Sequence, residues 1–122
     1  WSGIGDVLNA HQEALEATSG LDHNFCVNHA ASRQLKEVGS ARDLDSGLCM
    51  RVLTDMPGMQ VYTGNFIGDN TQGKDGARYA AHHGFCMETQ FYPDTPNNPE
   101  FPPCVLSPGE TFQSVTEYRI EQ

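Results

Sequence analysis

The chain has 122 residues, a length within the usual size of one domain. Seven Lys and Arg residues stand against sixteen Asp and Glu residues, so the formal net charge is -9. This charge argues against a nucleic acid or an anionic membrane as a partner. The apolar runs are also far shorter than the ~20 residues that span a bilayer. We therefore expect a soluble protein that comprises one domain or part of one.

The apolar pattern predicts one short helix followed by many strands. Residues 4–17 repeat apolar side chains at roughly helical spacing until Ser19 and Gly20 interrupt them, although Gly3 and Gly5 weaken the pattern. Beyond Gly20 short apolar or alternating runs are separated by Gly, Pro, Asn and Asp, as in a sheet protein with many turns. Strands are predicted at residues 24–28, 48–55, 60–66, 85–91, 104–106 and 111–120. No long helices lie between them, so an all-β, antiparallel sandwich is expected.

The predicted connections are of three kinds. Met56, Pro57 and Gly58 form a tight turn, and residues 68–76 form a glycine-rich exposed loop. Residues 93–103 contain five prolines in eleven positions, which predicts an extended, rigid crossing.

The four cysteines are widely separated, at positions 26, 49, 86 and 104. They lack the close pairs of a zinc site and the density of a disulfide scaffold. We expect reduced, buried thiols and a cytoplasmic protein.

Three segments place polar side chains where chemistry can occur. Asp22 stands in the Asp-His-Asn-Phe run at a predicted strand entrance, where an ordinary Asx turn is the alternative interpretation. Gln60 begins a segment in which polar and apolar side chains alternate. An ordinary half-buried strand is the alternative interpretation there. Glu88 interrupts an apolar strand, where burial would raise the pKa of a carboxyl. Glu88 is therefore a candidate general base, with a solvent-facing rim residue as the alternative.

The sequence does not indicate a metal site or a serine or cysteine nucleophile. His82 and His83 are adjacent, so on a strand they point to opposite faces and cannot both bind one ion. No Gly-x-Ser-x-Gly motif occurs, and no thiol lies at an evident helix start. We expect neither a metal nor a cofactor.

The same segments carry a family resemblance. Asp22-His23-Asn24-Phe25, then residues 57–66, then residues 84–90, then Pro108-Gly109-Glu110 follow in order the C-terminal signature of aldose 1-epimerases, the galactose mutarotases. The resemblance runs from about residue 4 to residue 120. It implies that residues 1–122 are the C-terminal portion of one mutarotase-type antiparallel β-sandwich.

The resemblance also implies a reaction and roles for individual residues. The family interconverts the α and β anomers of aldohexoses such as galactose or glucose without a cofactor, by acid/base opening of the sugar ring. By this match Glu88 is the catalytic base, and Asp22 and Gln60 bind the substrate. The histidine that acts as the acid in the family belongs to a segment before residue 4.

Two classes of function follow from these matches. The first is an enzyme chain that needs an N-terminal mutarotase segment, or another chain, to complete the sandwich and supply the acid. The second is a non-catalytic module that keeps the mutarotase face for binding carbohydrate or protein. The joint presence of Asp22, Gln60 and Glu88 favours the enzyme.

Overall fold

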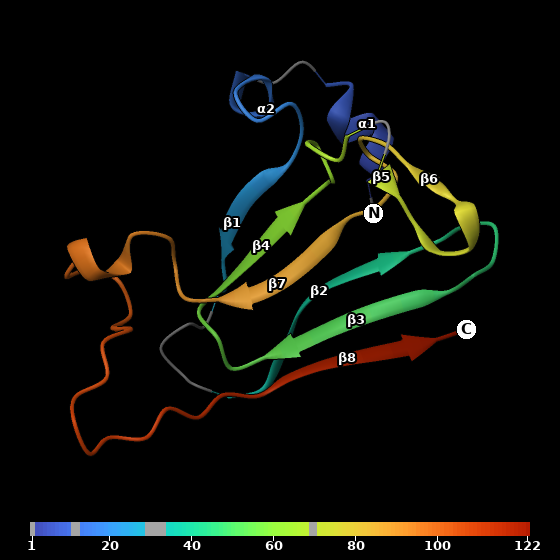
Figure 1. Cartoon of the computed structure of the whole chain (residues 1–122). Helices are drawn as coiled ribbons and strands as arrows, with labels where there is room; N and C mark the ends of the chain where they lie inside the picture. Colours follow the sequence, from blue (N-terminus) through green and yellow to red (C-terminus); the bar gives the residue numbers. More distant parts are fainter. Residues whose placement is uncertain (1, 11–12, 29–33, 69–70) are drawn as a thin grey trace. The chain divides into compact units, whose positions relative to one another are not determined.

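A computed structural model describes residues 2–10, 13–28, 34–68 and 71–122, and most of its regular structure is β (Figure 1). Two short helices and eight strands occur in this part of the chain: α1 Ile4–Leu8, α2 Glu13–Glu16, β1 Asp22–Cys26, β2 Lys36–Arg42, β3 Cys49–Thr54, β4 Gly58–Tyr62, β5 Thr71–Gln72, β6 Arg78–Tyr79, β7 Cys86–Gln90 and β8 Thr116–Glu121. Neither helix is long and apolar enough to cross a bilayer. The predicted all-β class is confirmed.

The chain divides into two compact units. One comprises Trp1–His23 and Gln60–Met87, and the other comprises Asn24–Met59 and Glu88–Gln122. The sheet with strand order β1-β4-β7 supplies residues to both units, because each of its strands contains a unit boundary. The sheet with order β2-β3-β8 lies wholly in the second unit.

Strand alternation places the ion pairs of the β2-β3-β8 sheet on one face, which also carries buried Leu53, and places Val52 on the other face. Both of its strand pairs are antiparallel, and β2 carries an irregularity between Glu37 and Gly39. On one face the guanidinium of Arg51 lies 3.1 Å from carboxylate oxygens of both Glu37 and Glu121. On the other face Val52, which is fully buried, pairs with Tyr118. The exposed ion pairs contribute little stability, so burial of Val52 and Leu53 stabilises this sheet more than they do.

Several predicted elements differ from the observed ones. The helix predicted over residues 4–17 is two shorter helices, and Gly5, which weakened the prediction, lies inside the first of them. The strand predicted at residues 104–106 is absent, and only the second half of the one predicted at 111–120 is β8. Strand β2 was not predicted because its sequence, KEVGSAR, has few apolar side chains.

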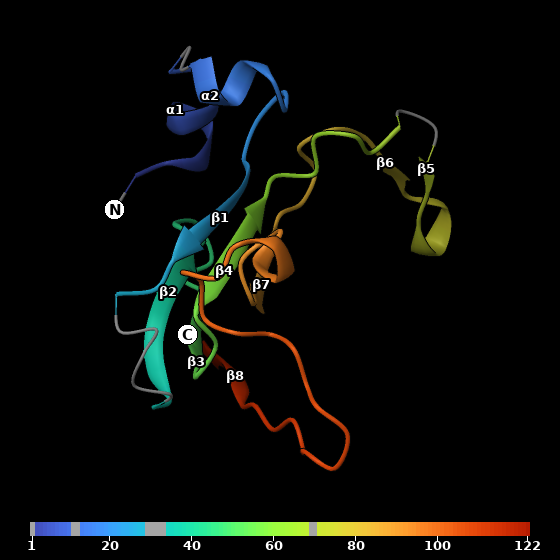
Figure 2. The same ribbon diagram turned by 90° about the vertical axis from the view of Figure 1, so that its left-hand side faces the viewer.

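The predicted loop and crossing both contain some regular structure. The short strands β5 and β6 pair as an antiparallel hairpin around the 3₁₀ turn η2, Lys74–Gly76. The proline-rich crossing contains the 3₁₀ turn η3, Thr95–Asn97. Figures 1 and 2 show the rest of the segment between β7 and β8 as a long extended connection. No residue from 93 to 103 is in a strand, but η3 departs from the predicted extended conformation. The rigidity of the crossing stays a prediction.

Candidate functional site

The two predicted substrate-binding residues, Asp22 and Gln60, are hydrogen-bonded to each other. The Nε2 atom of Gln60 on β4 donates to Oδ1 of Asp22 on β1 at 2.7 Å, and both side chains are partly buried. The bond fixes the direction of the amide, because only its nitrogen can donate to a carboxylate. The other amide atom, Gln60 Oε1, is the one buried side-chain polar atom among the described residues that lacks a hydrogen-bond partner.

Asp22 is positioned by a hydrogen-bond network around the residue that precedes it. The amide of buried Asn65 donates to the carbonyls of Thr18 and Leu21, at 2.8 and 2.9 Å. The Oδ1 atom of Asn65 accepts a hydrogen bond from the Thr63 hydroxyl at 2.6 Å. The main chains of Thr63 and Leu21 are also bonded, with the Thr63 N–H donating to the Leu21 carbonyl at 3.0 Å. Asn65, within the family-like segment 57–66, is therefore a structural clamp to which the sequence analysis gave no role.

Gly20 makes this close packing possible. Its φ is +143°, and a Cβ atom at this position would lie 2.4 Å from Asn65 Oδ1 and 2.8 Å from Thr63 Oγ1. An L side chain has no room here and rarely adopts this backbone conformation. The turn that enters β1 thus depends on glycine.

Two histidine rings in the same unit have defined bonding. Nδ1 of His23 accepts a hydrogen bond from the Asp22 main-chain N–H at 3.0 Å, which places the ring hydrogen of neutral His23 on Nε2. Nδ1 of His82 lies 3.0 Å from the Thr63 carbonyl and must donate to it. No group of three or more potential metal-ligating side chains occurs in residues 2–10, 13–28, 34–68 and 71–122. Two further histidines of the sequence, His11 and His29, lie outside the described residues.

Glu88 lies on β7, in the other unit from Asp22 and Gln60. Its side chain is exposed, while its neighbours Met87 and Thr89 are partly buried. Of the two sequence interpretations, the chain by itself therefore matches the solvent-facing one. The carboxylate is accessible, and desolvation would have to come from atoms outside the described residues.

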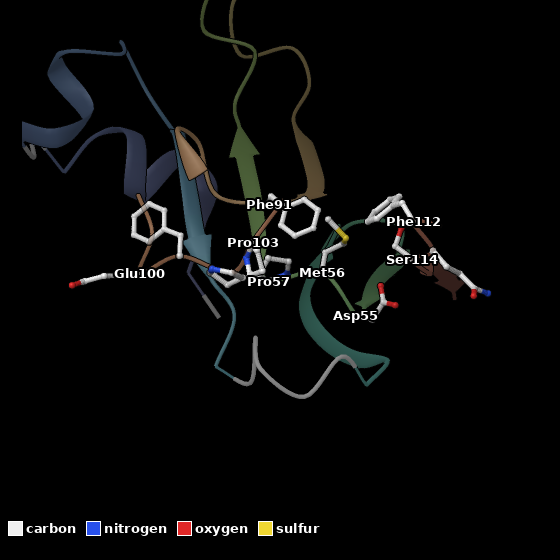
Figure 3. Close-up of a pocket in the computed structure, with 11 residues that line it drawn as sticks. Asp55, Met56, Pro57, Phe91, Glu100, Pro103, Phe112 and Ser114 are labelled. Atoms are coloured by element: carbon white, nitrogen blue, oxygen red, sulfur yellow. The ribbon is translucent and has the colours of Figure 1, made fainter. Parts of the chain in front are cut away.

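A pocket of about 390 Å³ lies in the second unit (Figure 3). Rings of phenylalanine and proline dominate its lining: Phe91, Phe101, Phe112, Pro57, Pro102 and Pro103, together with Met56 and four polar residues. The Asp55 carboxylate at its rim already accepts the Val115 N–H at 2.9 Å, and Figure 3 shows the Glu100 side chain pointing away from the other labelled residues. The three predicted site residues do not line it. The pocket therefore lacks the converging polar groups that a sugar requires.

The cysteines are all unpaired, as predicted, but they are not buried. Cys26 and Cys86 are exposed, and Cys49 and Cys104 are partly exposed. The prediction of buried thiols is therefore wrong for this chain, because the strand ends that carry Cys26 and Cys86 are not covered. Beside Cys26, burial and then a hydrogen bond with the thiol raise the pKa of the Tyr92 phenol above its usual value.

The chain matches proteins of known family over most of its length. The family model for aldose 1-epimerase matches residues 5–119. Galactose mutarotase of Mus musculus is 44% identical over 101 residues, which are 83% of this chain and 29% of that protein. Galactose mutarotase of Homo sapiens is 43% identical over 102 residues, or 84% of this chain and 29% of that protein.

A bacterial relative matches over the same share of the chain. Aldose 1-epimerase of Escherichia coli strain K12 is 38% identical over 103 residues, again 83% of this chain and 29% of the relative. The mostly antiparallel β-structure and these matches define a member of an isomerase family. The chain belongs to the aldose 1-epimerase family, and it spans about 29% of the length of these relatives.

Proposed function

We propose that this chain supplies the catalytic base and part of the sugar-binding face of a mutarotase that interconverts the anomers of an aldohexose. The observation that carries the proposal is the Gln60–Asp22 hydrogen bond of 2.7 Å, in a chain that belongs to this family. A carboxylate held through one oxygen keeps its second oxygen for a sugar hydroxyl. A hydroxyl that reached Gln60 Oε1 would also satisfy that buried acceptor.

Glu88 takes the role of base in this proposal. Its carboxylate removes the proton of the C1 hydroxyl while a protonated imidazole gives a proton to the ring oxygen, and the ring opens. Rotation about the C1–C2 bond presents the other carbonyl face, and closure reverses both proton transfers. No metal or redox step is needed to balance this reaction.

The proton donor comes from a further mutarotase segment, either in the same polypeptide or in another chain. Surface composition supports this requirement. The described residues bury only four hydrophobic side chains, Leu15, Val52, Leu53 and Met59, whereas fifteen large ones are exposed, among them Val105, Phe112 and Ile120. A completing segment would have these exposed apolar side chains available for contact. A segment covering Glu88 would also exclude water from its carboxylate.

Complementation tests the proposal. The chain is mixed with, or fused to, the preceding part of mouse galactose mutarotase, and mutarotation of α-D-galactose is followed by polarimetry with the spontaneous rate subtracted. We expect acceleration by the combination and by neither part alone. A stable complex without acceleration would instead support the non-catalytic binding module. Full activity of the chain alone would contradict the need for a separate acid.

A further inference from the structure

A chain of three threonine hydroxyls ties β7 to the other sheet of the second unit. Thr89 Oγ1 on β7 lies 2.5 Å from Thr116 Oγ1 on β8. Thr116 Oγ1 in turn lies 3.1 Å from Thr54 Oγ1 on β3. Thr54 is only 1% exposed, whereas Thr116 is exposed, so the chain runs from the surface into the core. All three residues belong to the same compact unit.

The number of hydrogens available fixes the direction in which the three threonine hydroxyls donate to one another. A threonine hydroxyl has one hydrogen to donate. The Thr54 hydroxyl donates to the Val115 carbonyl at 3.1 Å and accepts the Met56 N–H, also at 3.1 Å. Thr116 must therefore donate to Thr54. Because the hydrogen of Thr116 is then used, Thr89 must donate to Thr116, and each hydroxyl supports the next.

The series of three threonine hydroxyls determines which face of β7 carries Glu88. Successive side chains of a strand point to opposite faces, so holding Thr89 toward β8 turns Glu88 to the other face of β7. A slip by one residue would exchange the two. The Glu88 face has its own anchor, because Gln90 shares it and donates from Nε2 to Asn24 Oδ1 at 3.3 Å. Hydrogen bonds thus hold both faces of the strand next to Glu88.

We infer that Thr116 is a positioning residue for the base: it is the middle hydroxyl of the series from Thr89 through Thr116 to Thr54, which holds Glu88 on the face of β7 that it shares with Gln90. The inference rests on the proposed function for its catalytic consequence, but the anchoring of β7 does not depend on it. A displacement of about 1 Å at a reacting group can cost about 10²-fold in rate. Loss of the Thr116 hydroxyl should therefore reduce turnover without removing a sugar contact.

The first arm of the test uses the 122-residue chain. Amide hydrogen exchange of β7 and β2 is compared in wild type, Thr116→Val, which keeps the shape, and Thr116→Ser, which keeps the hydroxyl. Thr111→Val, at an exposed position before β8, is the control. We expect exchange in β7 to quicken about five- to tenfold in Thr116→Val, the equivalent of about one hydrogen bond. Exchange in β2 should be unchanged, and Thr116→Ser and Thr111→Val should resemble wild type.

The second arm measures mutarotation in the complemented enzyme. We expect Thr116→Val to lower kcat at least tenfold with KM within about twofold, and Thr116→Ser to restore kcat. If amide exchange in Thr116→Val is faster in every strand, the substitution has destabilised the whole fold. Thr89→Val, which removes the first hydroxyl of the series, is then used instead and should speed exchange in β7 alone. Unchanged β7 exchange in the Val variants, or an equal effect of Thr116→Ser, would overturn the inference. An inactive wild-type complex with the predicted exchange pattern would overturn the proposed function alone.

Discussion

Gln60 and Asp22 face each other across β4 and β1, with the amide nitrogen 2.7 Å from a carboxylate oxygen. The two residues lie 38 positions apart in the sequence, so only the folded sheet joins them. The bond orients both side chains at once: Asp22 is held through Oδ1, and the Gln60 amide cannot rotate without placing two acceptors together. This shared orientation gives Asp22 a binding role in the mutarotase account.

Replacing Asp22 tests that role. Asp22→Asn keeps the size of the side chain but removes the negative charge that accepts hydroxyl hydrogen bonds most strongly. In the complemented enzyme we expect KM for galactose to rise about tenfold or more while kcat changes less, because a binding contact is lost and no proton acceptor is. Initial-rate polarimetry over a range of galactose concentrations measures both constants. A fall in kcat with an unchanged KM would assign Asp22 to proton transfer instead.

Gly20→Ala should destabilise the chain strongly. The new methyl group would stand 2.4 Å from Asn65 Oδ1, on a backbone with φ of +143°. Strain and contact together should cost about 3 kcal/mol in the free energy of unfolding. Gly47→Ala is the matched control, since Gly47 has φ of +75° but open space around it. It should lose only about 1 kcal/mol. Urea denaturation compares them, and equal losses would mean that the contact with Asn65 has no energetic effect.

Asn65→Asp should replace a hydrogen-bond donor with an acceptor at the centre of the Asn65 clamp. The new carboxyl would face the Thr18 and Leu21 carbonyls without the two N–H donors that now bind them. At neutral pH we expect a loss of about 3 kcal/mol or more, because a buried charge would be left beside two acceptors.

The loss in Asn65→Asp should shrink as the pH falls. Burial beside carbonyls raises the pKa of the new carboxyl in the folded state, so the folded protein binds its proton more tightly than the unfolded chain. The stability that protonation recovers is present at low pH and is lost as the pH rises through that raised pKa. Unfolding by urea at several pH values measures this, with Asn28→Asp at an exposed position as the control. A loss independent of pH would contradict the clamp.

The cysteines should react in two groups. We expect four free thiols under denaturing, non-reducing conditions, since none is paired. In the native chain, exposed Cys26 and Cys86 should react with a thiol reagent before the partly exposed Cys49 and Cys104. Cys26→Ser and Cys86→Ser should each remove one equivalent from the fast phase, and Cys49→Ser should not. Titration of fewer than four thiols in the denatured chain would contradict this account. So would a fast phase of unchanged amplitude in both Cys26→Ser and Cys86→Ser.

Sequence reasoning found the elements whose pattern is local. Apolar runs predicted β3 and β7 to within one residue at each end, because their side chains pack on a sheet. It missed β2, where seven residues with only two hydrophobic side chains, Val38 and Ala41, are held by antiparallel pairing to β3. Pairing between distant segments is a tertiary effect that a local pattern does not contain.

The candidate site shows the same division. Asp22, Gln60 and Glu88 were proposed from their motifs, whereas Asn65 and Thr116 were given no role. Asn65 acts through main-chain carbonyls 44 and 47 positions away, and Thr116 through hydroxyls 27 and 62 positions away. Asn and Thr are common in turns and strands, so their type alone gives no signal. Only the geometry identifies them as supports for the strands that carry the site.

The Glu88→Gln variant tests the central claim most directly. This change keeps the size of the side chain and much of its hydrogen bonding but removes the basic carboxylate, so galactose should still bind. Polarimetric mutarotation of α-D-galactose by the complemented enzyme, corrected for the spontaneous rate, should show kcat reduced by roughly 10²- to 10⁴-fold with little change in KM. Glu110→Gln, at an exposed position outside β7, is the matched control and should retain full turnover. Near-normal kcat in Glu88→Gln would contradict the assignment of Glu88 as the base.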